Sequence, residues 1–71
     1  MIKVRVHSLP DGNLIIETYN VLPTEVKHRV DVVNKDTSLE DQAKQIARGI
    51  GNMGTEEEIL AALQSPIPPI E

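Results

Sequence analysis

The chain of 71 residues contains no cysteine, no tryptophan and no phenylalanine, and Tyr19 is its one tyrosine. Without cysteine, the chain has no disulfide framework, no thiolate metal site and no cysteine nucleophile. The covalent and metal supports that often stabilise a mini-protein are therefore missing, although a chain of this size buries only a thin core. Oligomerisation is the remaining common supplement, so we expect a homodimer.

Long apolar runs are also absent, because no stretch approaches the roughly 20 residues that cross a bilayer. Residues 1–6 place charges inside their apolar stretch, which is not the pattern of a signal peptide. Leu, Ile and Val together make up a larger share of the residues than the roughly 20% below which a chain is expected to be disordered. These features predict a folded, cytoplasmic domain over residues 1–65 without a membrane partner, followed by a proline-rich tail over residues 66–71.

The first half of the sequence alternates apolar and polar residues with the period of a half-buried strand. Alternating segments cover residues 2–7 and 26–32, while the strand expected at residues 14–19 is rather apolar on both faces, which suits a central strand. Proline and glycine in residues 9–13 predict a turn between the first two segments. Pro23 interrupts the chain before the third, since proline cannot donate to a strand ladder. A short strand at residues 20–22 is a possible fourth.

Alternation also assigns the two faces of these strands. We expect the more apolar face of the third segment to lie in the core, with the histidine at its edge; this face carries Val26, His28, Val30 and Val32. We expect the basic residues to share the opposite, solvent-exposed face, where they are Lys3, Arg5, Lys27 and Arg29. Such a face could bind RNA or single-stranded DNA. Binding platforms of that kind stack bases on aromatic side chains, however, so direct nucleic-acid binding is the alternative hypothesis.

The second half of the sequence has the period of an α-helix. Thr37 with Glu40, or Ser38 with Asp41, predicts a capping box at the start of the first helix. The apolar positions 39, 43, 46, 47 and 50 fall on one side of that helix, and Gly49 and Gly51 end it. A second box at Thr55 and Glu58 opens a second helix, whose apolar positions are 59, 60 and 63. Strands followed by helices predict an α+β fold, in which two short helices pack on one face of a three-stranded antiparallel sheet.

No catalytic, cofactor or metal motif is convincing. The segment Gly49–Gly54 matches G-x-G-x-x-G, but a helix precedes it and three glutamates follow it, so we interpret it as a turn between helices. The same glutamates argue against a helix-turn-helix that reads DNA. The two histidines, His7 and His28, do not make a zinc site, and no serine has the context of a nucleophile. We expect no enzyme activity, no cofactor and no metal.

The excess negative charge is confined to the second half of the chain. Residues 1–36 are neutral overall, whereas residues 37–71 carry the whole net charge of −4. Carboxylates in the first turn of a helix are stabilised by its macrodipole, which explains one or two acids per helix better than three consecutive ones. The candidate partner-binding residues are Asp31, Asp36, Glu40, Asp41, Glu56, Glu57 and Glu58.

This acidic helical half predicts a non-catalytic protein-binding module that engages a basic partner. The sharper hypothesis is an inhibitor that imitates DNA and occupies a nucleoid-type DNA-binding protein, since spaced carboxylates can resemble a phosphate backbone. Small acidic proteins of phages and mobile elements offer an analogy of size and charge. A structural homodimer that pairs through a sheet edge is a further alternative. In the tail, Ile67 and Ile70 are candidates for packing on a neighbouring subunit.

Overall fold

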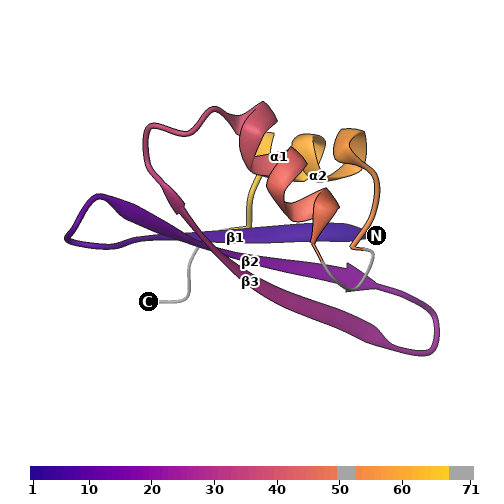
Figure 1. Ribbon diagram of the computed structural model, residues 1–71. Coiled ribbons are helices and arrows are strands. Elements are labelled where there is room, and N and C mark those ends of the chain that lie inside the picture. Colours follow the sequence, from indigo (N-terminus) through magenta and orange to yellow (C-terminus); the bar gives the residue numbers. More distant parts are fainter. Residues whose placement is uncertain (50–52, 68–71) are drawn as a thin grey trace.

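The computed structural model describes residues 1–49 and 53–67, and contains three strands followed by two helices (Figure 1). The elements are β1 (Ile2–Ser8), β2 (Asn13–Val21), β3 (Val26–Asn34), α1 (Leu39–Arg48) and α2 (Glu56–Gln64). The strands form one antiparallel sheet in the order β1-β2-β3. The predicted α+β arrangement is confirmed. The possible fourth strand is not formed within the described ranges, because residues 20 and 21 complete β2.

The turn between β1 and β2 sets the register of the first hairpin. Gly12 has a φ of +88°, a left-handed conformation that glycine adopts without steric cost. The backbone N–H of Asn13 donates to Oδ1 of Asp11 over 3.0 Å, which closes the turn. Val6 then lies opposite Ile16 on the same face of the sheet.

Both helices begin at the capping residues that the sequence offers. Oγ of Ser38 accepts a hydrogen bond from the backbone N–H of Asp41, so the cap forms at Ser38, the second of the two predicted positions. Oγ1 of Thr55 accepts one from the backbone N–H of Glu58. Gly49 ends α1, while the predicted turn residues 50–52 lie outside the described residues. Neither described helix is long and apolar enough to cross a membrane.

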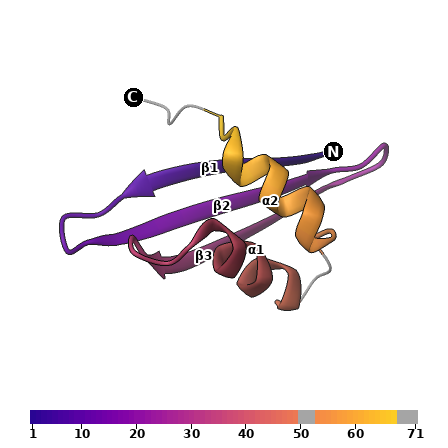
Figure 2. The same ribbon diagram turned by 90° about the horizontal axis from the view of Figure 1, so that it is seen from above.

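The core lies between the sheet and the two helices, which cover the same face (Figure 1). Seen from above, α2 crosses β1 and β2, while α1 lies on the β3 side (Figure 2). The buried apolar side chains are Val4, Ile16, Val33, Ala43, Ile46, Met53, Ile59 and Leu63. Each element contributes at least one of them, so the packing depends on the whole order of strands and helices.

The predicted orientation of β3 is wrong. Arg29 and Asp31 face the helices, and Asp31 is only 6% exposed. Val30 and Val32 point to the uncovered side and are 54% and 56% exposed. His28 is exposed on that same side instead of lying at the edge of the core. The reversal is tolerated because Arg29 and Asp31 pair with each other beneath α1, which lowers the cost of burying their charges.

The predicted basic face is therefore divided between the two sides of the sheet. Lys3 and Lys27 lie opposite Tyr19 and Asn20, two consecutive residues of β2. Consecutive residues of a strand point to opposite faces, so the two lysines lie on opposite faces as well. The same alternation places Arg5 on the uncovered side. A platform that combines all four basic residues does not form.

The described part of the tail lies against its own chain. The backbone N–H of Ile67 donates to the carbonyl of Val4 over 2.8 Å, and Ile67 forms a parallel bridge with Arg5. Ile67 thus covers the outer edge of β1, which differs from its expected place on a neighbouring subunit. Ile70, the other tail residue of that hypothesis, lies outside the described residues.

Candidate functional site

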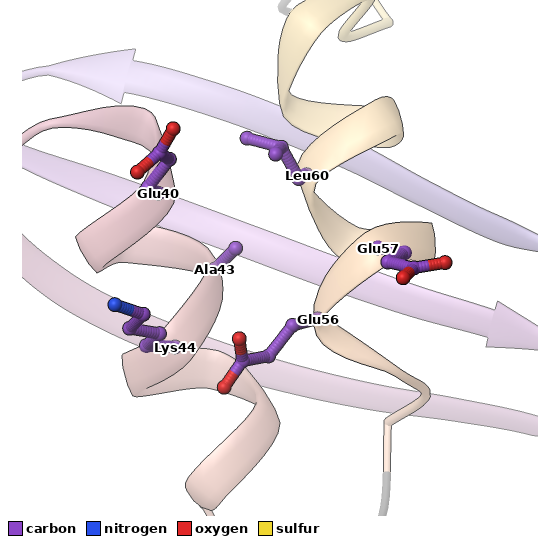
Figure 3. A pocket seen from close by; sticks show the side chains of 6 residues that line it. All are labelled: Glu40, Ala43, Lys44, Glu56, Glu57 and Leu60. Carbon is purple, nitrogen blue, oxygen red and sulfur yellow. The ribbon is translucent and has the colours of Figure 1, made fainter.

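An open groove separates the exposed sides of α1 and α2 (Figure 3). It has a volume of about 180 Å³ and is lined by Glu40, Ala43, Lys44, Glu56, Glu57 and Leu60. The apolar side chains of Ala43 and Leu60 lie between carboxylates from both helices (Figure 3). Glu40 comes from the first turn of α1, and Glu56 from the first turn of α2. Because the helices run antiparallel, the acids of their two capped ends line the same groove from its opposite ends (Figure 3).

The structure brings three of the seven candidate partner-binding residues together in this groove, namely Glu40, Glu56 and Glu57. Asp41 and Glu58 are exposed in the same helical turns, and their backbone N–H groups donate to the capping side chains. Asp36 is exposed in the turn after β3, apart from the groove. Asp31 lies beneath the helices and takes no part in the exposed acidic surface.

Asp31 belongs to a contact that joins β3 to the end of α1. Nη2 of Arg29 lies 2.8 Å from Oδ1 of Asp31, and Nη1 donates to the carbonyl of Ile46 over 3.3 Å. That carbonyl belongs to the last turn of α1, where a positive charge is favoured by the macrodipole. A Cβ on residue 49 would overlap the guanidinium of Arg29, so a larger residue there would require the Arg29 side chain to move. Gly49 therefore serves packing and gives no support to a phosphate-binding loop.

A second polar cluster lies on the uncovered side of the sheet, around Glu17. The hydroxyl of Tyr19 donates to Oε2 of Glu17 over 2.6 Å. Arg5 and His7 place nitrogens 3.7 and 3.4 Å from the same carboxylate. The ring of Tyr19 stacks on that of His28 with the centroids 4.5 Å apart. Alternation along β2 places Glu17 and Tyr19 on one face, but only the pairing register brings Arg5, His7 and His28 beside them, and sequence reasoning missed the cluster for that reason.

The hydrogen bond between Tyr19 and Glu17 shifts the acidities of both groups. It stabilises the ionised carboxylate, so the pKa of Glu17 lies below its ordinary value of 4.5, with smaller contributions from His7 and Arg5. It also stabilises the protonated phenol, so the pKa of Tyr19 lies above 10.0. Since the pKa of Glu17 is lower in the folded state, its stabilising contribution is present above pH 4.5 and is lost as the pH falls through the folded value.

Replacing Tyr19 by phenylalanine is expected to raise the pKa of Glu17 towards its ordinary value, because the strongest stabilisation of the carboxylate is removed. A carbon-detected NMR titration of the Glu17 carboxyl measures this directly. The parent chain, titrated under the same conditions, is the reference. Identical titrations of Glu17 in both proteins would contradict the assigned cause.

Within residues 1–49 and 53–67, no three histidine, aspartate or glutamate side chains gather in a way that could hold a metal ion. No family model, curated protein or solved structure matches the chain. The function is therefore inferred from the arrangement of the chain's own residues.

Proposed function

We propose that this chain is a non-catalytic protein-binding module whose acidic helical surface binds a basic partner protein. The acidic helical surface consists of Glu40, Asp41, Glu56, Glu57 and Glu58. The observation that carries the proposal is the groove between the helices, where carboxylates from α1 and α2 flank an apolar floor.

The chemistry of this groove suits the side chains of lysine and arginine. Both have a long aliphatic stem and a charged tip, so the stem can cover Ala43 and Leu60 while the tip reaches a carboxylate. Lys44 lines the same groove and competes for these carboxylates. Because Lys44 repels a cationic partner, its neutralisation should strengthen binding, whereas neutralisation of Glu56 or Glu57 should weaken it.

The sharper form of the proposal is that the partner is a nucleoid-type DNA-binding protein and that this chain occupies its DNA site. Rigid helices hold the carboxylates at fixed positions, as the backbone of a duplex holds its phosphates. Direct binding of nucleic acid through the sheet is less well supported, because Lys27 and Arg29 face the helices and do not join Lys3 and Arg5.

Capture of partners from a bacterial lysate by the tagged full-length chain tests the proposal. We expect a basic protein that is released steeply by salt, and the DNA-mimic form additionally requires that added DNA competes it off. The affinity of the purified partner should fall about tenfold for the double variant Glu56→Gln/Glu57→Gln at low salt, since two charge contacts are lost. Lys44→Gln should bind more tightly than the parent chain.

The matched control is Glu25→Gln, which removes an exposed carboxylate from the turn between β2 and β3. This variant should bind like the parent chain. Equal affinities of the parent chain and the double glutamine variant at low salt would overturn the proposal, and so would capture of acidic proteins alone. A basic partner that DNA does not displace would overturn the DNA-mimic form while retaining the acidic surface.

A further inference from the structure

We propose that the uncovered face of the sheet is the interface of a symmetric dimer, in which it packs against the same face of a second copy. This open face lies on the side of the sheet away from the helices (Figure 1). It is independent of the acidic helical surface, so either proposal can fail without the other.

The open face gathers nearly all of the exposed large apolar side chains of the described residues. Six such side chains are at least 41% exposed, and all but Leu39 lie on this face: Met1, Val21, Val26, Val30 and Val32. Val26 is 59% exposed although it begins a nine-residue strand. Exposed apolar side chains that gather on one face of a small protein mark an interaction site more often than they mark a solvated surface.

Apolar residues occupy both ends of the open face, and the rows between them are polar except for Val30, which lies opposite Glu17. At one end, Val21 of β2 lies opposite Val26 of β3. At the other end, Ile15 lies opposite Val32. The cluster around Glu17 and Tyr19 occupies the middle rows, between these two apolar ends.

This layout is complementary to itself. A two-fold axis that crosses the strands between Tyr19 and Glu17 exchanges the two ends of the face. Valine 26 of one copy then covers Val32 of the other, and Val21 covers Ile15, as in sheets that pack about 10 Å apart. In the middle rows the same axis sets Tyr19 against Glu17 of the second copy, and Val30 against its His28.

The same axis brings the like charges of Lys3 and Arg5 from the two copies towards each other at the rim of the face. Lys3 and Arg5 lie on β1 at the rim of the face, and their stems allow the charged groups to reach water. The outer edge of β1 is already bridged by Ile67, so the sheet is not free to extend on that side. The valines of the open face are therefore buried by packing of this face against a second copy, and not by adding a strand at the edge of β1.

The size of the face predicts a weak dimer. A standard interface buries about 800 Å² per partner with 20–30 residues, so about a dozen residues bury about 400 Å² per copy. Interfaces of that size belong to weak, reversible complexes, and we expect dissociation in the micromolar range. Such a weak, self-complementary surface fits a second copy of this chain, because that partner is always present at the concentration of the chain itself.

Sedimentation equilibrium of the full-length chain from about 10 μM to about 1 mM brackets the expected affinity. The mass should rise from monomer to dimer over this range. Dilution should shift the methyl NMR signals of Ile15, Val30 and Val32, while those of the buried Ile46 and Ile59 remain constant. This measurement needs no variant, so a failure to fold cannot obscure it.

The variant Val30→Asp places a charge at the centre of the face and should weaken the dimer at least tenfold. Leu39→Asp is the matched control, because it charges an exposed apolar side chain outside the face and should leave the dimer intact. A monomer throughout the concentration range would overturn the proposal. A dimer unaffected by Val30→Asp would also overturn it. Dilution shifts confined to backbone amides at the outer edge of β3 would overturn it too, because they would indicate pairing through that edge.

Discussion

Arg29→Ala is expected to lower the free energy of unfolding by about 3 kcal/mol, because the substitution leaves the buried carboxylate of Asp31 without its cation. The side chain of Asp31 is 5% exposed, so water cannot replace the lost partner. Its Oδ2 already lacks a hydrogen-bond partner among the described residues, and the substitution would leave Oδ1 unpaired as well. The last turn of α1 would lose the donor to the carbonyl of Ile46 at the same time.

A double variant separates this cause from a simple loss of packing. Arg29→Met/Asp31→Leu removes both charges and keeps side chains of similar length beneath α1, so it should recover most of the stability that Arg29→Ala loses. Arg48→Ala, which removes an exposed arginine from the same end of α1, should change the stability by less than about 0.5 kcal/mol. Urea unfolding followed by circular dichroism gives all three values. A double variant less stable than Arg29→Ala would contradict the electrostatic explanation.

The helices and their ends could be predicted from the sequence because their signals are local. Ser38 and Thr55 each cap a helix with a hydrogen bond that spans three residues. The apolar positions of α1 recur with the period of a helix, and Ala43 and Ile46 are buried as that period predicts. Neither signal requires knowledge of how the helices meet the sheet.

The orientation of β3 could not be predicted in the same way, because alternation defines two faces without stating which one is buried. A preference for apolar residues in the core selects the face of Val30 and Val32. The contact that decides the matter joins Arg29 to the carbonyl of Ile46, which is 17 residues away. The space that Gly49 leaves for the guanidinium of Arg29 is a local trace of this contact, but a glycine at the end of a helix is also expected for other reasons.

The acidic residues of the candidate site were visible in the sequence, but their grouping was not. Carboxylates at the N-termini of antiparallel helices were expected at opposite ends, about 15 Å apart. The helices do pack antiparallel, with Glu40 and Glu56 towards opposite ends of one groove, and Lys44 lines that groove as well (Figure 3). Because β3 has the opposite orientation to the predicted one, Asp31 is buried beneath the helices and does not belong to the exposed acidic surface.

Ile16→Ala is expected to cost about 3 kcal/mol or more, since Ile16 is fully buried at the centre of the sheet and its truncation leaves a cavity against the helices. A domain of this size has a total stability of only about 4–10 kcal/mol, so the variant should unfold at a much lower urea concentration. Val32→Ala, which truncates an apolar side chain on the open face, should change the stability of the monomer by less than about 0.5 kcal/mol in dilute solution.

The comparison of these two variants tests which face of the sheet the helices cover. If β3 had the orientation that hydrophobicity alone favours, Val32 would lie in the core and its truncation would be costly. In the structure, Ile16 is buried in the core whereas Val32 is exposed on the open face. We therefore expect the stability of the monomer to depend on Ile16 and not on Val32. Urea unfolding at a concentration well below the expected dissociation constant distinguishes the two orientations, because a large loss for Val32→Ala is compatible only with a covered valine face.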